Sequence, residues 1–135
     1  MGRLGWQHEF RERSWPELLD FHAPIWAKAP EGQYLVDIIL SVIASGRSDD
    51  LPVTSSMHDL VVVGRPVPGP PMDVLFVRAP GSLHRPKKGC VLIEYEAVSG
   101  RDTRIERPVA DAVPLFWRFV AEKFGIESGT RTNDT

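Results

Sequence analysis

Four residues in the segment 55–59 are of the types that carry out nucleophilic catalysis. Ser55 and Ser56 offer hydroxyls, His58 offers an imidazole and Asp59 offers a carboxylate. Catalytic triads are assembled by geometry from distant segments, and one short loop cannot easily orient all three groups. The chain also lacks a Gly-x-Ser-x-Gly elbow and a glycine-rich oxyanion loop. We therefore interpret the segment as a polar connector whose side chains satisfy nearby backbone groups.

Two carboxylates, Glu94 and Glu96, occupy alternate positions in a strand-like run and therefore share one face. Paired carboxylates act as acid and base when a desolvated pocket raises the pKa of one of them. Arg101, Arg104 and Arg107 follow in the next run and would hold both carboxylates ionised. The sequence thus favours cross-strand charge pairing over acid–base catalysis.

The concentrated basic segment of the chain contains His84, Arg85, Lys87 and Lys88. Such a run can bind a phosphate, a nucleic-acid backbone or an acidic partner. It lacks the interleaved aromatic residues of a single-strand binder and any recognition helix, so we do not expect nucleic acid. Anion binding by these four residues is one hypothesis, and a solubilising loop between two apolar strands is the other.

Metal and cofactor motifs are absent from the sequence. The four histidines are scattered, Cys90 is the single cysteine, and no phosphate loop or dinucleotide fingerprint occurs. We therefore predict no metal and no cofactor. A single cysteine is typical of a reducing compartment, and no apolar run resembles a signal peptide or spans a bilayer. These features predict a cytoplasmic protein without membrane association.

Three helical and four strand-like segments must position these side chains. Ser14 and Glu17 form a helix-start motif, and we expect this first helix to end before Pro24. The pattern predicts an α+β fold with two N-terminal helices, a four-stranded antiparallel meander sheet and a C-terminal helix packed on the sheet. The strands are expected over residues 60–63, 74–77, 91–97 and 103–109, and the two longer helices over residues 33–45 and 112–124.

The 135 residues fit one domain, which we place at residues 1–126, with a disordered polar tail over residues 127–135. The net charge of -2 gives no general attraction to nucleic acid or to an anionic membrane.

The last hairpin has two possible registers. A three-residue loop, residues 99–101, would place Tyr95 opposite Ile105 and Glu96 opposite Arg104. A two-residue loop would mix apolar and charged residues on each face, because a shift of one residue exchanges the faces of a strand. We predict the longer loop.

Apolar surface exceeds what a small monomer needs to bury. The first strand is apolar on both faces and would be a sheet edge in a simple meander, which invites pairing with another chain. This pattern predicts a symmetric homodimer, and a cover formed by the aromatic segment 6–26 is the competing explanation. The helix over residues 33–45 has only one narrow polar row, formed by Gln33, Asp37, Ser41 and Ser45.

We interpret the chain as a non-catalytic protein-interaction module, such as an adaptor, an inhibitor or a homo-oligomeric accessory protein. The interpretation rests on missing catalytic motifs and on the excess of apolar helix surface. The alternative is a small-molecule-binding domain or a small enzyme with a pocket between sheet and helices, lined by Trp26, Tyr95 and Trp117. A pocket with convergent polar groups favours a ligand, whereas a filled core with exposed apolar residues favours a protein partner.

Overall fold

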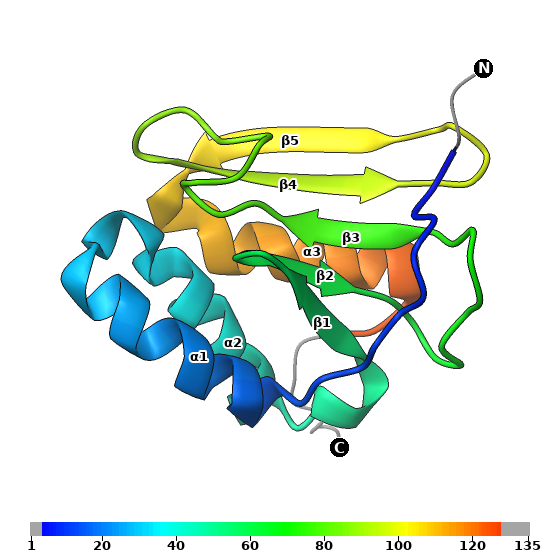
Figure 1. Cartoon of the computed structure of the whole chain (residues 1–135), viewed down its shortest axis with the longest axis horizontal. Coiled ribbons are helices and arrows are strands. Elements are labelled where there is room, and N and C mark those ends of the chain that lie inside the picture. The colour runs from blue at the N-terminus through cyan, green and yellow to red at the C-terminus, as the bar shows by residue number, and fades with distance from the viewer. Residues whose placement is uncertain (1–3, 128–135) are drawn as a thin grey trace.

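The computed structural model describes residues 4–127, and it places three helices against an antiparallel sheet (Figure 1). Of the predicted tail, all but the first residue lies outside the described residues. The helices are α1 (Trp15–Lys28), α2 (Gln33–Ser45) and α3 (Ala112–Phe124), with short helical turns at Pro30–Gly32, Ser48–Asp50 and Val109–Asp111. The strands are β1 (Val53–Ser56), β2 (Asp59–Val62), β3 (Val74–Val77), β4 (Cys90–Glu96) and β5 (Thr103–Pro108).

The predicted α+β class is confirmed, but the sheet has five strands in the order β1-β2-β3-β4-β5 rather than four. The strand missing from the prediction is β1, whose polar sequence we interpreted as a connector. It pairs with β2 through a two-residue turn, Met57 and His58. Met57 has φ 59°, the left-handed conformation that such tight hairpin turns require. An edge strand tolerates polar side chains because backbone pairing defines it, so apolar content alone did not reveal β1.

Helix α1 begins at the predicted capping box, in which Ser14 and Glu17 cap one another's backbone N–H groups. It does not end before Pro24, as predicted, but continues to Lys28. A proline inside a helix removes one hydrogen bond, but burial of Trp15 and Trp26 on the same helix opposes that loss.

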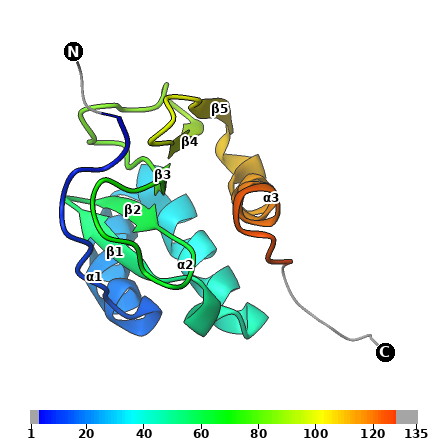
Figure 2. The same cartoon turned by 90° about the vertical axis from the view of Figure 1, so that its right-hand side faces the viewer.

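Helices α2 and α3 have the predicted bounds, and each ends at a glycine with positive φ, Gly46 and Gly125. Helix α2 lies between α1 and α3 (Figure 2). All three pack on what we call the inner face of the sheet, where alternate strand residues such as Leu60, Leu75 and Ile93 are fully buried. The core therefore fills the space between helices and sheet.

The opposite, outer face is crossed by the N-terminal segment, residues 4–13. Trp6 pairs with Met72, and Arg13 pairs with Val53 at the sheet edge. Phe10 and Trp6 pack on outer-face residues, Phe76 among them. Strand β2 is thus an interior strand covered on both sides. The homodimer stays a prediction. The exposed side chains of Leu40 and Ile43 on α2 are apolar surface that still favours it.

The β4–β5 hairpin departs from the predicted register by two residues. Tyr95 pairs with Thr103 and Glu94 with Arg104. A shift of two keeps every side chain on its predicted face. The loop is longer because the Asp102 carboxylate accepts a hydrogen bond from the backbone N–H of Ala97, which ends the pairing early.

Within residues 4–127, no helix combines the length and the apolar character that crossing a bilayer requires.

Candidate functional site: an acidic pocket on the outer face

The three aromatic residues predicted to line a pocket make separate contacts. The indole N–H of Trp26 donates to His22 Nδ1 at 2.9 Å, and that of Trp117 donates to Ser41 Oγ at 3.0 Å. The Tyr95 hydroxyl donates to Asp73 Oδ2 at 3.2 Å. None of the three lines the clefts described below.

The residues considered for a triad lie on the β1–β2 hairpin, where they make other contacts. The imidazole of His58 stacks on Phe21, with ring centroids 5.7 Å apart. The carboxylate of Asp59 accepts hydrogen bonds from Arg78 and Ser82 instead of orienting an imidazole. This arrangement supports a structural role for Asp59.

A buried arginine, Arg78, gathers three carboxylates on the outer face. It follows β3, and its side chain is 6% exposed. The guanidinium donates to Glu94 Oε1 at 2.6 Å, to Asp59 Oδ2 at 3.0 Å and to Glu96 Oε2 at 3.3 Å. It also stacks over the ring of Phe76, 3.8 Å from the centroid. Alternation along the strands explains this convergence, because all five residues point to the outer face.

The three carboxylates differ in how fully they are engaged. Asp59 Oδ1 accepts from the backbone N–H of Ala79 at 2.7 Å, and Oδ2 accepts from the hydroxyl of Ser82 at 2.9 Å. Glu94 has a second ion pair with Arg104, at 3.5 Å. Glu96, in contrast, is 31% exposed and contacts only Arg78 among the described residues.

Burial raises the pKa of Glu96, and the neighbouring carboxylates of Glu94 and Asp102 raise it further, while Arg78 and His84 act in the opposite direction. Glu96 is also the most exposed of the three carboxylates, and an additional cation would oppose the rise in its pKa because it favours the ionised form. Glu96 is therefore the group in the cluster that can accept a new partner.

A hollow of about 370 Å³ opens over this cluster, and we call it the acidic pocket. Its wall includes the aromatic rings of Trp6 and Phe76, and its rim carries two strongly exposed apolar side chains, Met57 at 84% and Leu83 at 100%. Three carboxylates surround one buried arginine, and only Glu94 has a second cation, Arg104, so negative charge is in excess at the floor. The residues lining the pocket are Trp6, Ser56, Met57, Asp59, Phe76, Arg78, Gly81, Ser82, Leu83, His84 and Glu96.

The structure divides the basic segment of the sequence between two hollows. His84 lines the acidic pocket, whereas Arg85, Lys87 and Lys88 line a second hollow of about 440 Å³, which we call the basic cleft. Glu31 is the acidic residue in its wall. The four residues proposed to bind anions together are therefore not brought to one site.

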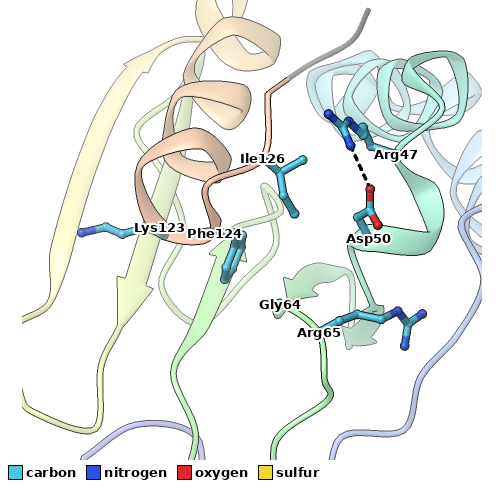
Figure 3. A pocket seen from close by; sticks show the side chains of 7 residues that line it. All are labelled: Arg47, Asp50, Gly64, Arg65, Lys123, Phe124 and Ile126. Carbon is cyan, nitrogen blue, oxygen red and sulfur yellow. Dashed lines mark hydrogen bonds and ion pairs between the residues drawn. The ribbon is translucent and has the colours of Figure 1, made fainter. Parts of the chain in front are cut away.

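A third hollow, of about 510 Å³, lies where α3 ends, and we call it the α3-end groove (Figure 3). Phe124 and Ile126 face its centre, while Lys123 points away from it. Arg47 is paired with Asp50 at 3.2 Å. Arg65, at the other side of the groove, is paired at 2.6 Å with Glu12 of the N-terminal segment.

Sequence reasoning missed the centre of the acidic pocket. It placed Glu94 and Glu96 on one face but looked for their partners only on the following strand, where Arg104 does contact Glu94. Arg78 and Asp59 were given no joint role. A usable signal was present: Arg78 follows Phe76 by two residues, so it shares a face with it.

No group of three or more His, Cys, Asp or Glu side chains within residues 4–127 is placed to hold a metal ion. The chain matches no protein-family model, and neither curated proteins nor solved structures show significant similarity to it.

Proposed function

We propose that this chain is a non-catalytic protein-interaction module whose partner inserts a basic side chain, lysine or arginine, into the acidic pocket. The observation that carries the proposal is the convergence of three carboxylates on a single buried arginine. Arg78 and Arg104 together do not neutralise three carboxylates, and Glu96 keeps an oxygen without a hydrogen bond among the described residues. A cationic group is the ligand that this arrangement favours.

The rim supports a protein partner over a free small molecule. Leu83 and Met57 are the two most exposed large apolar side chains of the described residues, and both border the pocket. Exposed apolar side chains around a polar centre are typical of protein interfaces, where they exclude water from the charged contact.

The pocket gives less support to catalysis. The hydroxyl of Ser82 donates to Asp59, so it is not activated by the imidazole of His84, which lies in the same wall. The alternative, a small-molecule-binding domain or small enzyme, is favoured by the volume of about 370 Å³. That volume lies in the range of small-ligand sites.

The test uses N-acetylarginine amide as a probe, followed by amide chemical shifts of the full chain. We expect shifts at Ser82 and His84, and about fivefold weaker binding in Glu96→Gln, the loss that corresponds to about 1 kcal/mol. Glu122→Gln is the matched control, because Glu122 is exposed on α3 and pairs with Arg118. No shifts, or equal weakening by both substitutions, would overturn the proposal.

A second measurement separates the partner classes. A peptide with leucines on both sides of the arginine should bind more tightly than N-acetylarginine amide, because the leucines bury Met57 and Leu83. Equal affinity would favour the small-molecule alternative.

A further inference from the structure

One loop, residues 79–89 between β3 and β4, separates the acidic pocket from the basic cleft. Pro80 lines the cleft while Gly81, the next residue, lines the pocket. The same change occurs again between His84, in the pocket, and Arg85, in the cleft. Consecutive Cα atoms are about 3.8 Å apart, so the two hollows adjoin across a single thickness of chain.

Carboxylates hold this dividing loop at both ends. Asp59 accepts hydrogen bonds from the backbone N–H of Ala79 at 2.7 Å and from Ser82 Oγ at 2.9 Å. Glu106 accepts from the backbone N–H of Lys87 at 2.8 Å. The wall is therefore fixed before any ligand arrives, which lowers the entropic cost of binding across it.

The two sides of the loop carry opposite charge. Arg85 and Lys88 have no ion pair within the described residues, and Lys87 has only a 3.9 Å contact with Glu106. On the other side, the three carboxylates at the acidic pocket outnumber the two arginines, Arg78 and Arg104, that pair with them. Leu83 belongs to the segment between the two sides and is fully exposed.

We infer that the partner segment crosses this loop, with a basic side chain in the acidic pocket and an acidic side chain over the basic cleft. The inference rests on the proposed function and specifies its partner. The two side chains are separated by three intervening residues, because positions i and i+4 of an extended chain point to the same side and lie up to about 13 Å apart. A segment of one charge would be repelled by one of the two hollows, so the pair of hollows selects alternating charge. Leu83 contacts the residues between the two charges.

The experiment compares two synthetic peptides by calorimetry with the full chain. One carries an arginine and a glutamate separated by three glycines, and the other carries glutamine in place of the glutamate. Each is made in both sequence orders, because the loop does not fix the direction of the bound segment. In one order at least, we expect the glutamate peptide to bind about three- to fivefold more tightly, as for one additional exposed ion pair.

Paired variants assign that gain to the cleft. Lys87→Gln combined with Lys88→Gln should reduce the advantage of the glutamate peptide, because Arg85 is then the one cation left among the lining residues, while leaving the glutamine peptide unchanged. The matched control is Arg11→Gln combined with Arg101→Gln, which removes two exposed cations outside both hollows and should preserve the advantage.

The outcomes separate this inference from the proposed function. If both peptides and N-acetylarginine amide bind through Glu96 but the glutamate adds nothing, the inference is overturned and the proposed function stands. If neither peptide nor the arginine probe binds, both are overturned. A glutamate advantage that is undiminished by loss of Lys87 and Lys88 also overturns the inference.

Discussion

The acidic pocket and the α3-end groove are both hollows with several charged residues, but their charges are arranged differently. In the groove, Lys123 points away, Arg47 pairs with Asp50, and Arg65 pairs with Glu12 (Figure 3). In the acidic pocket, three carboxylates meet at Arg78. The comparison teaches that a charged site can bind a new partner where side chains of like charge lie together and outnumber the opposite charges that pair with them.

The difference comes from the elements that supply the residues. The carboxylates of the pocket stand on β2 and β4, on either side of β3, and strand alternation turns them to one face. The groove is built from chain segments at the ends of helices and from the connector after β2. There Arg47 and Arg65 each have a carboxylate partner nearby, and nothing aligns the charges with one another.

The largest expected effect tests this comparison directly. Arg78→Ala removes the cation shared by three buried or half-buried carboxylates, of which only Glu94 keeps another ion pair, and should lower the free energy of unfolding by about 3–5 kcal/mol. Arg65→Ala removes a guanidinium from the edge of the groove, where the ion pair is exposed, and should cost less than about 1 kcal/mol. Urea denaturation of both variants measures the difference. Equal losses would contradict the contrast between the two regions.

A second substitution tests whether the acidic pocket is independent of the packing of α3, the helix at whose end the groove lies. Trp117→Ala should cost about 3–5 kcal/mol, because the indole is 9% exposed and fastens α3 to Ser41 of α2. Binding of N-acetylarginine amide to the folded fraction should persist, since the pocket is on the other face of the sheet. Trp117→Phe, which removes the hydrogen bond and part of the indole ring but keeps an aromatic side chain, should cost less, about 1–2 kcal/mol. Denaturation midpoints that barely move would show that α3 is not anchored by this residue.

The pH dependence of stability compares a buried side chain whose polar groups have partners with one that has an unpaired polar atom. Arg78 is buried with partners for its charge, whereas Nε2 of His22 is buried without a hydrogen bond. Burial lowers the pKa of His22 from 6.5 to about 4, with a smaller contribution from His58. The unfolded chain therefore takes up a proton below pH 6.5 that the folded chain refuses until about pH 4, so this contribution to stability falls as pH falls through that window.

Between pH 7 and pH 5 the loss should be about 1–2 kcal/mol. Urea midpoints at the two pH values measure it, and the difference should shrink in His22→Phe, which has no titratable ring at that position. An unchanged difference would assign the pH dependence to other groups.

The smallest expected effect is a gain in stability at the rim of the pocket. Met57 has φ 59° in the β1–β2 turn, a conformation that costs a side-chain-bearing residue about 1 kcal/mol or more. Met57→Gly should raise the free energy of unfolding by about 0.5–1 kcal/mol and weaken binding of the leucine-flanked peptide. A variant that is both more stable and equally able to bind would show that the methionine has no part in recognition.

Local sequence signals were sufficient to predict helices α2 and α3. The bounds of α2 and α3 follow from apolar periodicity and from Gly46 and Gly125, whose positive φ ends each helix. Strand β1 was missed because three of its four residues are polar, Thr54 among them, and an edge strand is defined by its backbone pairing. The register of the last hairpin was wrong by two because one side chain, Asp102, closes the loop.

The candidate site was harder to predict than the elements that carry it. Placing Glu94 and Glu96 on one face needs only the alternation of a single strand. Recognising that Asp59 and Arg78 join them requires the order of three strands, which is a non-local property. The three aromatic residues assigned to a pocket between sheet and helices each have their own contact in the fold.

The pairing of Trp6 with Met72 gives the molecule a reporter on its own pocket. Their backbones exchange two hydrogen bonds, of 2.8 and 3.0 Å, and the ring of Trp6 forms part of the pocket wall. The preceding Gly5 has φ +76°, and a Cβ there would lie 2.8 Å from the carbonyl oxygen of Met72. This short connection can open without unfolding the sheet, so its amide protons exchange with solvent through local opening. Occupation of the pocket would hold the wall closed, and deuterium uptake at these two amides would slow.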